Sequence, residues 1–208
     1  IDPKYGGPEY EAAAGFGSNC GVSDIEAVTK ANELCNRYVM DTISTSATLA
    51  FAMECFELGL IGPRDTDGLE LRFGNAEAML QGVEWIAKRQ GIGDLLAEGS
   101  YRAALKIGSN ALDYTVQVKG QEFAMHEPRG KVSVGLGFAV SEIGADHLVS
   151  IHDTLLANPG SVPFKGAEAL GIHNALPSRE LSDEKAGNYF LCENWVSLGK
   201  VLGLCYFG

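Results

Sequence analysis

The sequence predicts a mostly α-helical protein, and three observations carry this prediction. Five segments place apolar residues at helical spacing, with start or stop signals at their ends. Only residues 115–118 show the β-branched, alternating pattern of a strand. A composition of 46% hydrophobic and 21% charged residues over 208 positions is typical of a globular chain that buries a sizeable core.

The first two helices are expected to meet at Asp41. The capping-box pattern from Ser23 to Glu26 starts the first helix, which runs to about residue 38. Its expected apolar face comprises Ile25, Val28, Leu34 and Tyr38. The second helix covers residues 42–58 and ends at Gly59. A carboxylate close to the C-terminal end of a helix is unfavourable unless it meets a donor, and spacing alone leaves Asp41 open as a surface turn residue.

Three further helices follow in the same way. They are expected at residues 76–90, 94–107 and 182–198, with Gly91 and Gly108 ending the first two. Residues 120–144 are expected to form a loop leading into a short helix. Residues 158–179 carry three prolines and predict a long irregular connection.

Charge and cysteine usage exclude several classes of protein. A net charge of −11 argues against a nucleic-acid partner, and no apolar run is long enough to span a bilayer, so no membrane association is expected. The five cysteines form no C-x-x-C pair, and Cys20, Cys35 and Cys55 are expected to be buried as small hydrophobic residues. A reducing cytoplasm is the default location. The missing initiator Met and signal peptide suggest a fragment or a processed product.

Two six-residue segments share one layout. Asn36-Arg-Tyr-Val-Met-Asp41 and Lys200-Val-Leu-Gly-Leu-Cys205 each follow a predicted helix and end in a polar or thiol side chain. They resemble the paired Asp-x-x-Gly-Leu-(Asp/Cys) loops of the tungsten-containing aldehyde ferredoxin oxidoreductase family. Further resembling segments occur in the family's order over nearly the whole chain: Gly6–Glu11, Asp41–Thr45, Leu71–Asn75, Gly91–Gly99, Pro128–Gly130 and Gly144–His147.

The resemblance implies a fold, cofactors and a reaction. The fold would be multihelical, with two packed all-α subdomains as in the C-terminal part of the family, at residues 1–120 and 121–208. The first would carry one pterin loop and the active-site Glu, the second the active-site His and the cysteine loop, with the family's N-terminal pterin-binding domain absent.

The cofactors would be a tungsten (or molybdenum) bis-pterin and a [4Fe–4S] cluster in an anaerobic enzyme. An aldehyde would be oxidised with water to a carboxylic acid, and two electrons would pass to a ferredoxin. The acidic surface of this chain makes it a poor docking face for an acidic ferredoxin. A homo-oligomer is possible.

The resemblance also assigns the catalytic residues. The family's active-site glutamate falls on Glu11, with Glu9 as the fallback, whereas spacing alone favours one residue as a helix cap and the other as solvated. The family's proton-transferring histidine falls on His147, whose ordinary pKa suits that role. His152 is five residues further on, and on a helix the two rings would point well over 100° apart, so a shared metal ion is not expected.

The cofactor contacts are assigned in the same way. The implied cofactor-binding residues are Asn36, Met40, Asp41, Gly144, Ala145 and Leu204, and Cys205 would be the fourth cluster ligand. The chain departs from the family at Asn36, Val39, Ser46, Ile143, Val149 and Lys200. These departures favour one alternative, a cofactor-free helical domain. The other alternative is a family enzyme with a different substrate, such as one that reduces an aromatic thioester.

Overall fold

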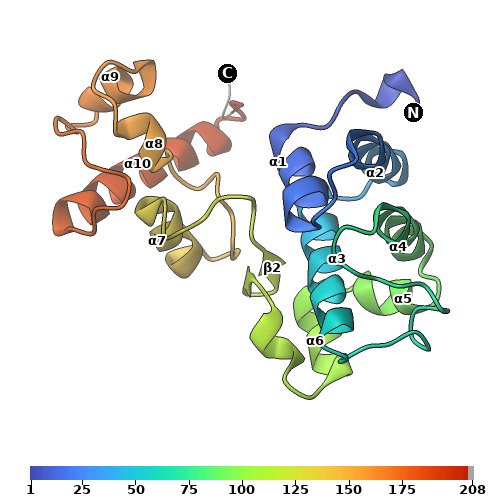
Figure 1. Ribbon diagram of the computed structural model, residues 1–208. Helices are drawn as coiled ribbons and strands as arrows, with labels where there is room; N and C mark the ends of the chain where they lie inside the picture. The colour runs from blue at the N-terminus through green and yellow to red at the C-terminus, as the bar shows by residue number, and fades with distance from the viewer. Residues whose placement is uncertain (206–208) are drawn as a thin grey trace. The chain divides into compact units, whose positions relative to one another are not determined.

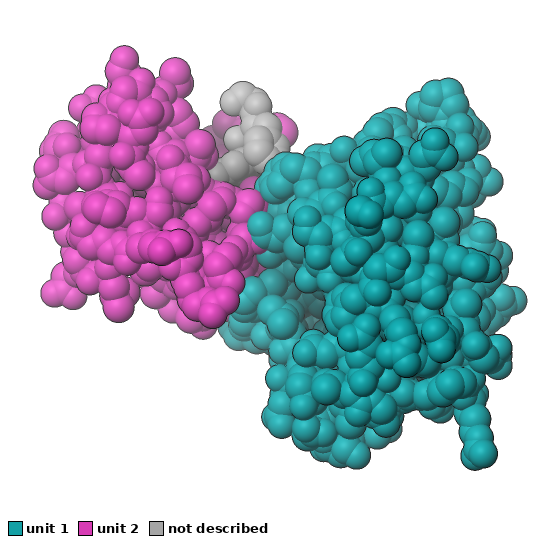
Figure 2. All heavy atoms as spheres, viewed as in Figure 1, with its two compact units in different colours: residues 1–125 teal, residues 126–208 magenta. Residues whose placement is uncertain are grey.

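The computed structural model describes residues 1–205 and divides the chain into two compact units, residues 1–125 and residues 126–208 (Figures 1 and 2). The division falls five residues after the boundary expected from the sequence, so both strands of the single hairpin belong to the first unit.

The first unit is built around one buried helix. Its helices are α1 (Tyr10–Ala13), a π-helical turn (Ala14–Asn19), α2 (Ile25–Tyr38), α3 (Thr42–Glu57), α4 (Ala76–Lys88), α5 (Ile92–Leu96) and α6 (Ser100–Ile107). Short 3₁₀ turns lie at Pro3–Tyr5 and Ala111–Tyr114, and β1 (Gln117–Val118) pairs antiparallel with β2 (Gln121–Glu122). α3 contacts α1, α2, α4, α5 and α6 (Figure 1). It buries ten of its sixteen residues, which lie on all sides of the helix. A helix that is apolar all round belongs in a core.

The ends of α2 differ in detail from the prediction. Asp24, not Ser23, is the N-cap, and its carboxylate accepts from the backbone N–H groups of Glu26 and Ala27. Ile25 and Tyr38 are exposed, whereas Val28 and Leu34 are buried with small residues beside them. The predicted apolar face was therefore wrong at its two ends, because the buried face of α2 is formed by Val28, Leu34 and small residues in the middle of the helix.

The segment predicted as one helix at residues 94–107 is two helices. The first of them, α5, ends at Leu96, and the chain restarts as α6 at Ser100 after Gly99, which is the N-cap and has φ +83°. The backbone N–H and side-chain hydroxyl of Ser100 both donate to Oε1 of buried Glu122, at 2.7 and 2.8 Å. A carboxylate from β2 thus takes the place of an N-cap side chain.

The second unit has a smaller core. Its helices are α7 (Val132–Val140), α8 (Asp153–Leu156), α9 (Val162–Glu168) and α10 (Asp183–Val201). α9 lies in the stretch expected to be irregular, so that expectation was wrong: Ser161 caps the helix and proline occupies its first turn, where no N–H is needed. Ala167, Ile172 and Cys192 form a buried cluster, and α7 packs on α10.

The predicted fold class is confirmed. Ten α-helices and one two-stranded sheet make up the regular structure of residues 1–205, apart from short 3₁₀ and π turns. None of the helices in this described part is both long and apolar enough to cross a lipid bilayer.

Candidate functional site

Glu11 and Glu9 have different surroundings on α1. Glu9 is exposed and caps the helix by accepting from the backbone N–H of Glu11 at 3.0 Å. Glu11 is only 3% exposed, and its Oε2 accepts from the backbone N–H of Met125 at 2.7 Å. Since α1 packs on both α2 and α3, Glu11 is held on the helices that flank the first predicted loop.

Asp41 lies at a helix start and not only at a helix end. Its carboxylate caps α3, accepting from the backbone N–H of Ser44 at 2.7 Å. The unfavourable dipole expected from the end of α2 is therefore offset by the favourable N-terminus of α3. Asn36 is exposed and donates to the carbonyl of Tyr5, and Met40 packs against the core of the first unit.

The two six-residue loops have the same backbone conformation. Their fourth residues, Val39 and Gly203, have φ of +58° and +72°. The next N–H donates back over five residues in both, from Met40 to the carbonyl of Cys35 and from Leu204 to that of Gly199, each at 2.9 Å. This is the Schellman end of a helix, which is common and also ends α4, so the conformation alone does not identify a cofactor loop. The resemblance leads us to expect a glycine at position 39. Because Val39 has the same positive φ as Gly203, it keeps the backbone conformation of that glycine.

Cys205 is chemically distinct among the five cysteines. The other four thiols are buried, and burial raises the pKa of Cys20 and Cys35 to about 12 and of Cys55 and Cys192 to about 11. Cys205 is exposed directly after the second loop. The burial predicted for Cys20, Cys35 and Cys55 is confirmed. As one exposed thiol on a Schellman turn, Cys205 fits a single ligand position of an iron–sulfur cluster, which needs four.

Residues 144–147 form a turn linked to the end of α10. Gly144 has φ +106°, and Ala145 is buried. The carboxylate of Asp146 pairs with Lys200 at 3.3 Å. This ion pair ties the turn that carries His147 to the first residue of the second loop, so the second unit brings these two predicted site segments together.

His147 lies beside two further histidines, a grouping that the sequence did not predict. The rings of His126, His147 and His152 have centroid separations of 4.5, 4.6 and 5.6 Å. The expectation that His147 and His152 point apart was wrong, because residues 144–152 form turns and not a helix. No local signal marks His126, which is 21 residues away along the chain.

Hydrogen bonds fix the protonation of His152. Its Nε2 lies 2.8 Å from the carbonyl of His147, which can only accept, so Nε2 carries the proton. Lys131 Nζ lies 3.3 Å from Nδ1 of His152 and 2.9 Å from Nδ1 of His126, and donates to both lone pairs. Burial lowers the pKa of His152 to about 4, so its ring is neutral at pH 7.

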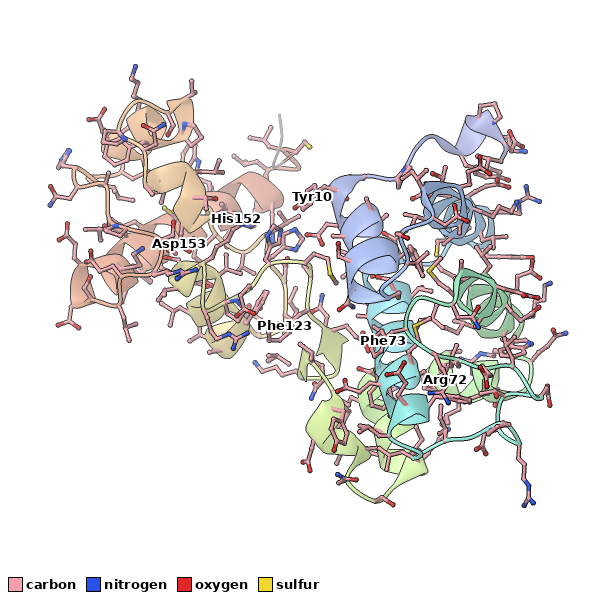
Figure 3. All side chains as sticks on the ribbon, viewed as in Figure 1. Tyr10, Arg72, Phe73, Phe123, His152 and Asp153 are labelled. Carbon is pink, nitrogen blue, oxygen red and sulfur yellow. The ribbon has the colours of Figure 1, made fainter. Side chains whose placement is uncertain are left out.

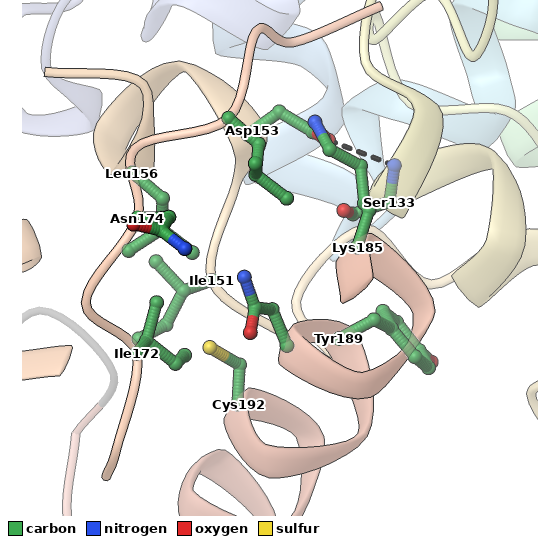
Figure 4. Close-up of a pocket in the computed structure, with 11 residues that line it drawn as sticks. Ser133, Ile151, Asp153, Leu156, Ile172, Asn174, Lys185, Tyr189 and Cys192 are labelled. Carbon is green, nitrogen blue, oxygen red and sulfur yellow. Dashed lines mark hydrogen bonds and ion pairs between the residues drawn. The ribbon is translucent and has the colours of Figure 1, made fainter. Parts of the chain in front are cut away.

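Asp153, next to His152, has a structural role (Figure 3). Its carboxylate accepts from the backbone N–H of Ser133 at 2.9 Å and pairs with Lys185 at 2.9 Å, and both partners of the ion pair are buried. These groups line a small pocket with Ile172, Tyr189 and Cys192 (Figure 4). With both oxygens engaged, Asp153 has no role as a ligand for the neighbouring histidines.

Comparisons with known proteins extend over the whole chain. A family model described as "Aldehyde ferredoxin oxidoreductase, domains 2 & 3" matches residues 1–208. Tungsten-containing aldehyde ferredoxin oxidoreductases of Pyrococcus horikoshii and Pyrococcus abyssi are each 38% identical over 204 residues, covering 97% of this chain and 31% of their own length. The chain therefore spans about a third of the length of these relatives. The solved active-site complex BamBC of benzoyl coenzyme A reductase, with 1,5-dienoyl-CoA, aligns with a TM-score of 0.55 at 28% identity, over 66% of this chain and 21% of that one.

Proposed function

Because the chain belongs to the aldehyde ferredoxin oxidoreductase family, we propose that it forms part of a cytoplasmic tungsten-pterin enzyme that oxidises an aldehyde to a carboxylic acid. The overall change is RCHO + H₂O → RCOOH + 2e⁻ + 2H⁺. The metal–pterin group, with molybdenum as a possible substitute for tungsten, would supply the two-electron redox chemistry. A [4Fe–4S] cluster and a ferredoxin would carry the electrons away.

The observation that carries this proposal is the second loop. It keeps the layout and turn of the first loop and ends in the exposed Cys205. Cys205 would supply one thiolate to the cluster, and the remaining three would come from residues outside this sequence. The backbone near Leu204 would hold one half of the pterin cofactor, and the loop of Asn36, Met40 and Asp41 the other half.

Gly144 and Ala145 would line the pterin site on the side of His147. The buried alanine and the positive φ of Gly144 let the backbone of this turn approach a flat ligand closely. Lys200, paired with Asp146, is a cation next to the second loop and could meet a pterin phosphate.

Two protons must leave in the balanced reaction, and Glu11 and His147 are the groups we assign to them. Glu11 is a buried carboxylate already fixed by the N–H of Met125, so it would position or deprotonate the water or the substrate oxygen. His147 would pass the second proton to solvent, since its imidazole is only half-buried.

The test is an assay of the natural polypeptide that carries this sequence, purified without oxygen and supplied with aldehydes and a viologen as electron acceptor. We expect Glu11→Gln to lower kcat by about 100-fold or more, because a general base contributes at least that much. Glu9→Gln is the matched control two residues away and should keep most of the activity. Equal activity of the two variants would remove Glu11 from the mechanism.

A second reaction is favoured by one comparison. The similarity to the benzoyl coenzyme A reductase complex reaches two thirds of this chain, so reduction of an aromatic thioester is the competing proposal. Reduced viologen and an aryl thioester in the same assay separate the two reactions. Oxidation of the reduced viologen without aldehyde turnover would favour the thioester.

A further inference from the structure

The three clustered histidines present nitrogen atoms to one another across a small gap. One ring nitrogen from each of His126, His147 and His152 lies within 4.8 Å of the other two. The residues come from three segments, namely the approach to α7, the turn after Gly144 and the N-cap of α8. His126 and His152 are 8% and 9% exposed, so two of the three rings are held by packing.

The lone pairs of this cluster converge on a cation. Nδ1 of His152 is unprotonated, because Nε2 donates to the carbonyl of His147. The ammonium of Lys131 donates to that Nδ1 and to Nδ1 of His126. Two imidazole lone pairs directed at a single positive charge are donors of the kind that a divalent metal ion binds. A backbone carbonyl on the other ring nitrogen is the usual outer partner of a metal-bound histidine.

We propose that His126, His147 and His152 form a binding site for a divalent transition-metal ion of the zinc type, and that the Lys131 ammonium occupies the place of the ion when no metal is bound. Binding moves the half-exposed Lys131 side chain towards solvent and draws the three nitrogens together by an ångström or more, to the spacing of ligands about 2.0 Å from zinc.

The proposed metal site does not require the reaction proposed above, but it shares His147 with that reaction. A metal ion here would take the lone pair of His147 and so compete with its role in proton transfer. The site is therefore tested by metal binding and not by catalysis.

The experiment titrates the 208-residue chain with Co²⁺ and then displaces it with Zn²⁺, following Co²⁺ visible absorption and the heat of binding at pH 7.5. Cys205→Ser is the background, because an exposed thiolate also binds these ions. We expect one equivalent of metal, and an absorption spectrum of nitrogen ligands without thiolate.

The variants make the assignment specific. His147→Gln, at a half-buried position that tolerates change, should weaken binding by at least about tenfold, as should His126→Gln. His173→Gln is the matched control, because His173 is exposed and lies outside the cluster. Lys131→Met should raise the affinity by about tenfold or more, since the competing ammonium is gone and the apolar side chain still fills its space. Far-UV circular dichroism on each variant checks that the fold is kept.

The contrary results are equally specific. If Lys131→Met binds no Co²⁺, or binds it more weakly than the parent chain, the site does not exist as described. If His173→Gln weakens binding as much as His147→Gln, the bound metal is on the surface and the proposal is wrong.

Discussion

Val39 combines a β-branched side chain with a left-handed backbone. It has φ +58° at the end of α2 and is 92% exposed, so no packing compensates for the strained conformation. An L-residue in this backbone region destabilises the folded chain by about 1–2 kcal/mol. Glycine removes this strain, but part of the gain is offset because glycine loses more conformational entropy on folding. We expect Val39→Gly to raise the free energy of unfolding by about 0.5–1 kcal/mol, measured by urea denaturation.

Val39→Ala is the control for that experiment. Alanine removes the branching but keeps Cβ, so it should recover only the smaller share of the strain. A Val39→Gly variant no more stable than Val39→Ala would show that the loop is unstrained, and that the glycine expected there has another purpose.

His152 makes stability depend on pH. Burial lowers its pKa from 6.5 to about 4 in the folded chain, so between these values the unfolded chain binds the extra proton. The contribution of His152 to the free energy of unfolding is fully present above the pKa of the unfolded chain. It is lost as the pH falls towards the pKa of the folded chain. Between pH 7.5 and pH 5 the loss from this group is at most about 2 kcal/mol. The measurement is the free energy of unfolding across that pH range.

A variant pair identifies the group responsible. His152→Gln should flatten the pH dependence between pH 5 and 7, whereas His173→Gln, at an exposed histidine, should leave it unchanged. The carboxylates of Glu33 and Glu127 have a pKa lowered to about 2 by hydrogen bonds from Lys30 and Arg129, so they titrate below this window. An unaltered pH profile in His152→Gln would show that His152 is not buried as a neutral ring.

Residue-level roles could be predicted only where a local pattern specifies them. The resemblance places the catalytic glutamate at Glu11 with Glu9 as the fallback, and the structure gives the two a physical difference in burial. His126 and Lys131 could not be found, because their link to His152 depends on turns that bring distant segments together. Asp41 was expected at the corner between two helices. Its role as the N-cap of α3 could not be predicted, because that requires knowing the exact residue at which α3 starts.

At the level of elements, Gly99 lies at the start of α6 as its N-cap. A Cβ on Gly99 would lie 3.0 Å from Oε1 of Glu122, the oxygen that accepts from Ser100. Gly108, at φ +76°, has nothing within 4 Å of the same position. We expect Gly108→Ala to cost about 1–2 kcal/mol from backbone strain alone, and Gly99→Ala to cost clearly more. Thermal unfolding of both variants measures the difference.

Equal losses in the two alanine variants would mean that Glu122 moves aside freely, so that the start of α6 does not depend on it. The break at Gly99 was missed in the sequence because Asp94 to Ile107 keeps a helical apolar pattern across it. The carboxylate that accepts from the first residue of α6 comes from a strand more than twenty residues later, which no local window contains.

The ion pair of Asp153 and Lys185 joins α8 to α10, and its surroundings differ from those of a surface pair. The side chains are 0% and 7% exposed. Lys185→Met leaves a buried carboxylate without its cation, which costs about 3–5 kcal/mol. Lys200→Met breaks the ion pair with Asp146. Because the Lys200 side chain is 47% exposed, this should lower the free energy of unfolding by less than about 1 kcal/mol. Urea denaturation of the two variants measures both losses in the free energy of unfolding. Similar losses would show that the Asp153–Lys185 pair is solvated like the Asp146–Lys200 pair.

Helices with clear caps were the most predictable elements. The starts and ends of α3 and α4 fall within two residues of the expected positions, because asparagine, aspartate and glycine mark them in the chain. α9 was missed although Ser161 and Pro163 are ordinary start signals. Three prolines in that stretch favoured an irregular segment, and the tertiary contact with α8 decided otherwise.

At the level of the whole molecule, the mostly α fold follows from composition and periodicity, whereas the proposed reaction follows from the family. The chain spans about a third of its relatives' length, and under the proposed function residues outside this sequence would supply the rest of the cofactor site. We therefore expect this chain alone to oxidise no aldehyde, and appreciable turnover by it would contradict the assignment of cluster ligands outside it.

Metal analysis of the natural polypeptide that carries this sequence, purified without oxygen, tests the proposed cofactors most directly. We expect tungsten (or molybdenum) together with iron, and an electron paramagnetic resonance signal of a reduced [4Fe–4S] cluster. That signal should be lost in Cys205→Ser and kept in the control Cys192→Ser. A polypeptide that contains no tungsten, molybdenum or iron would be a helical domain without a redox cofactor, and the proposed function would be wrong.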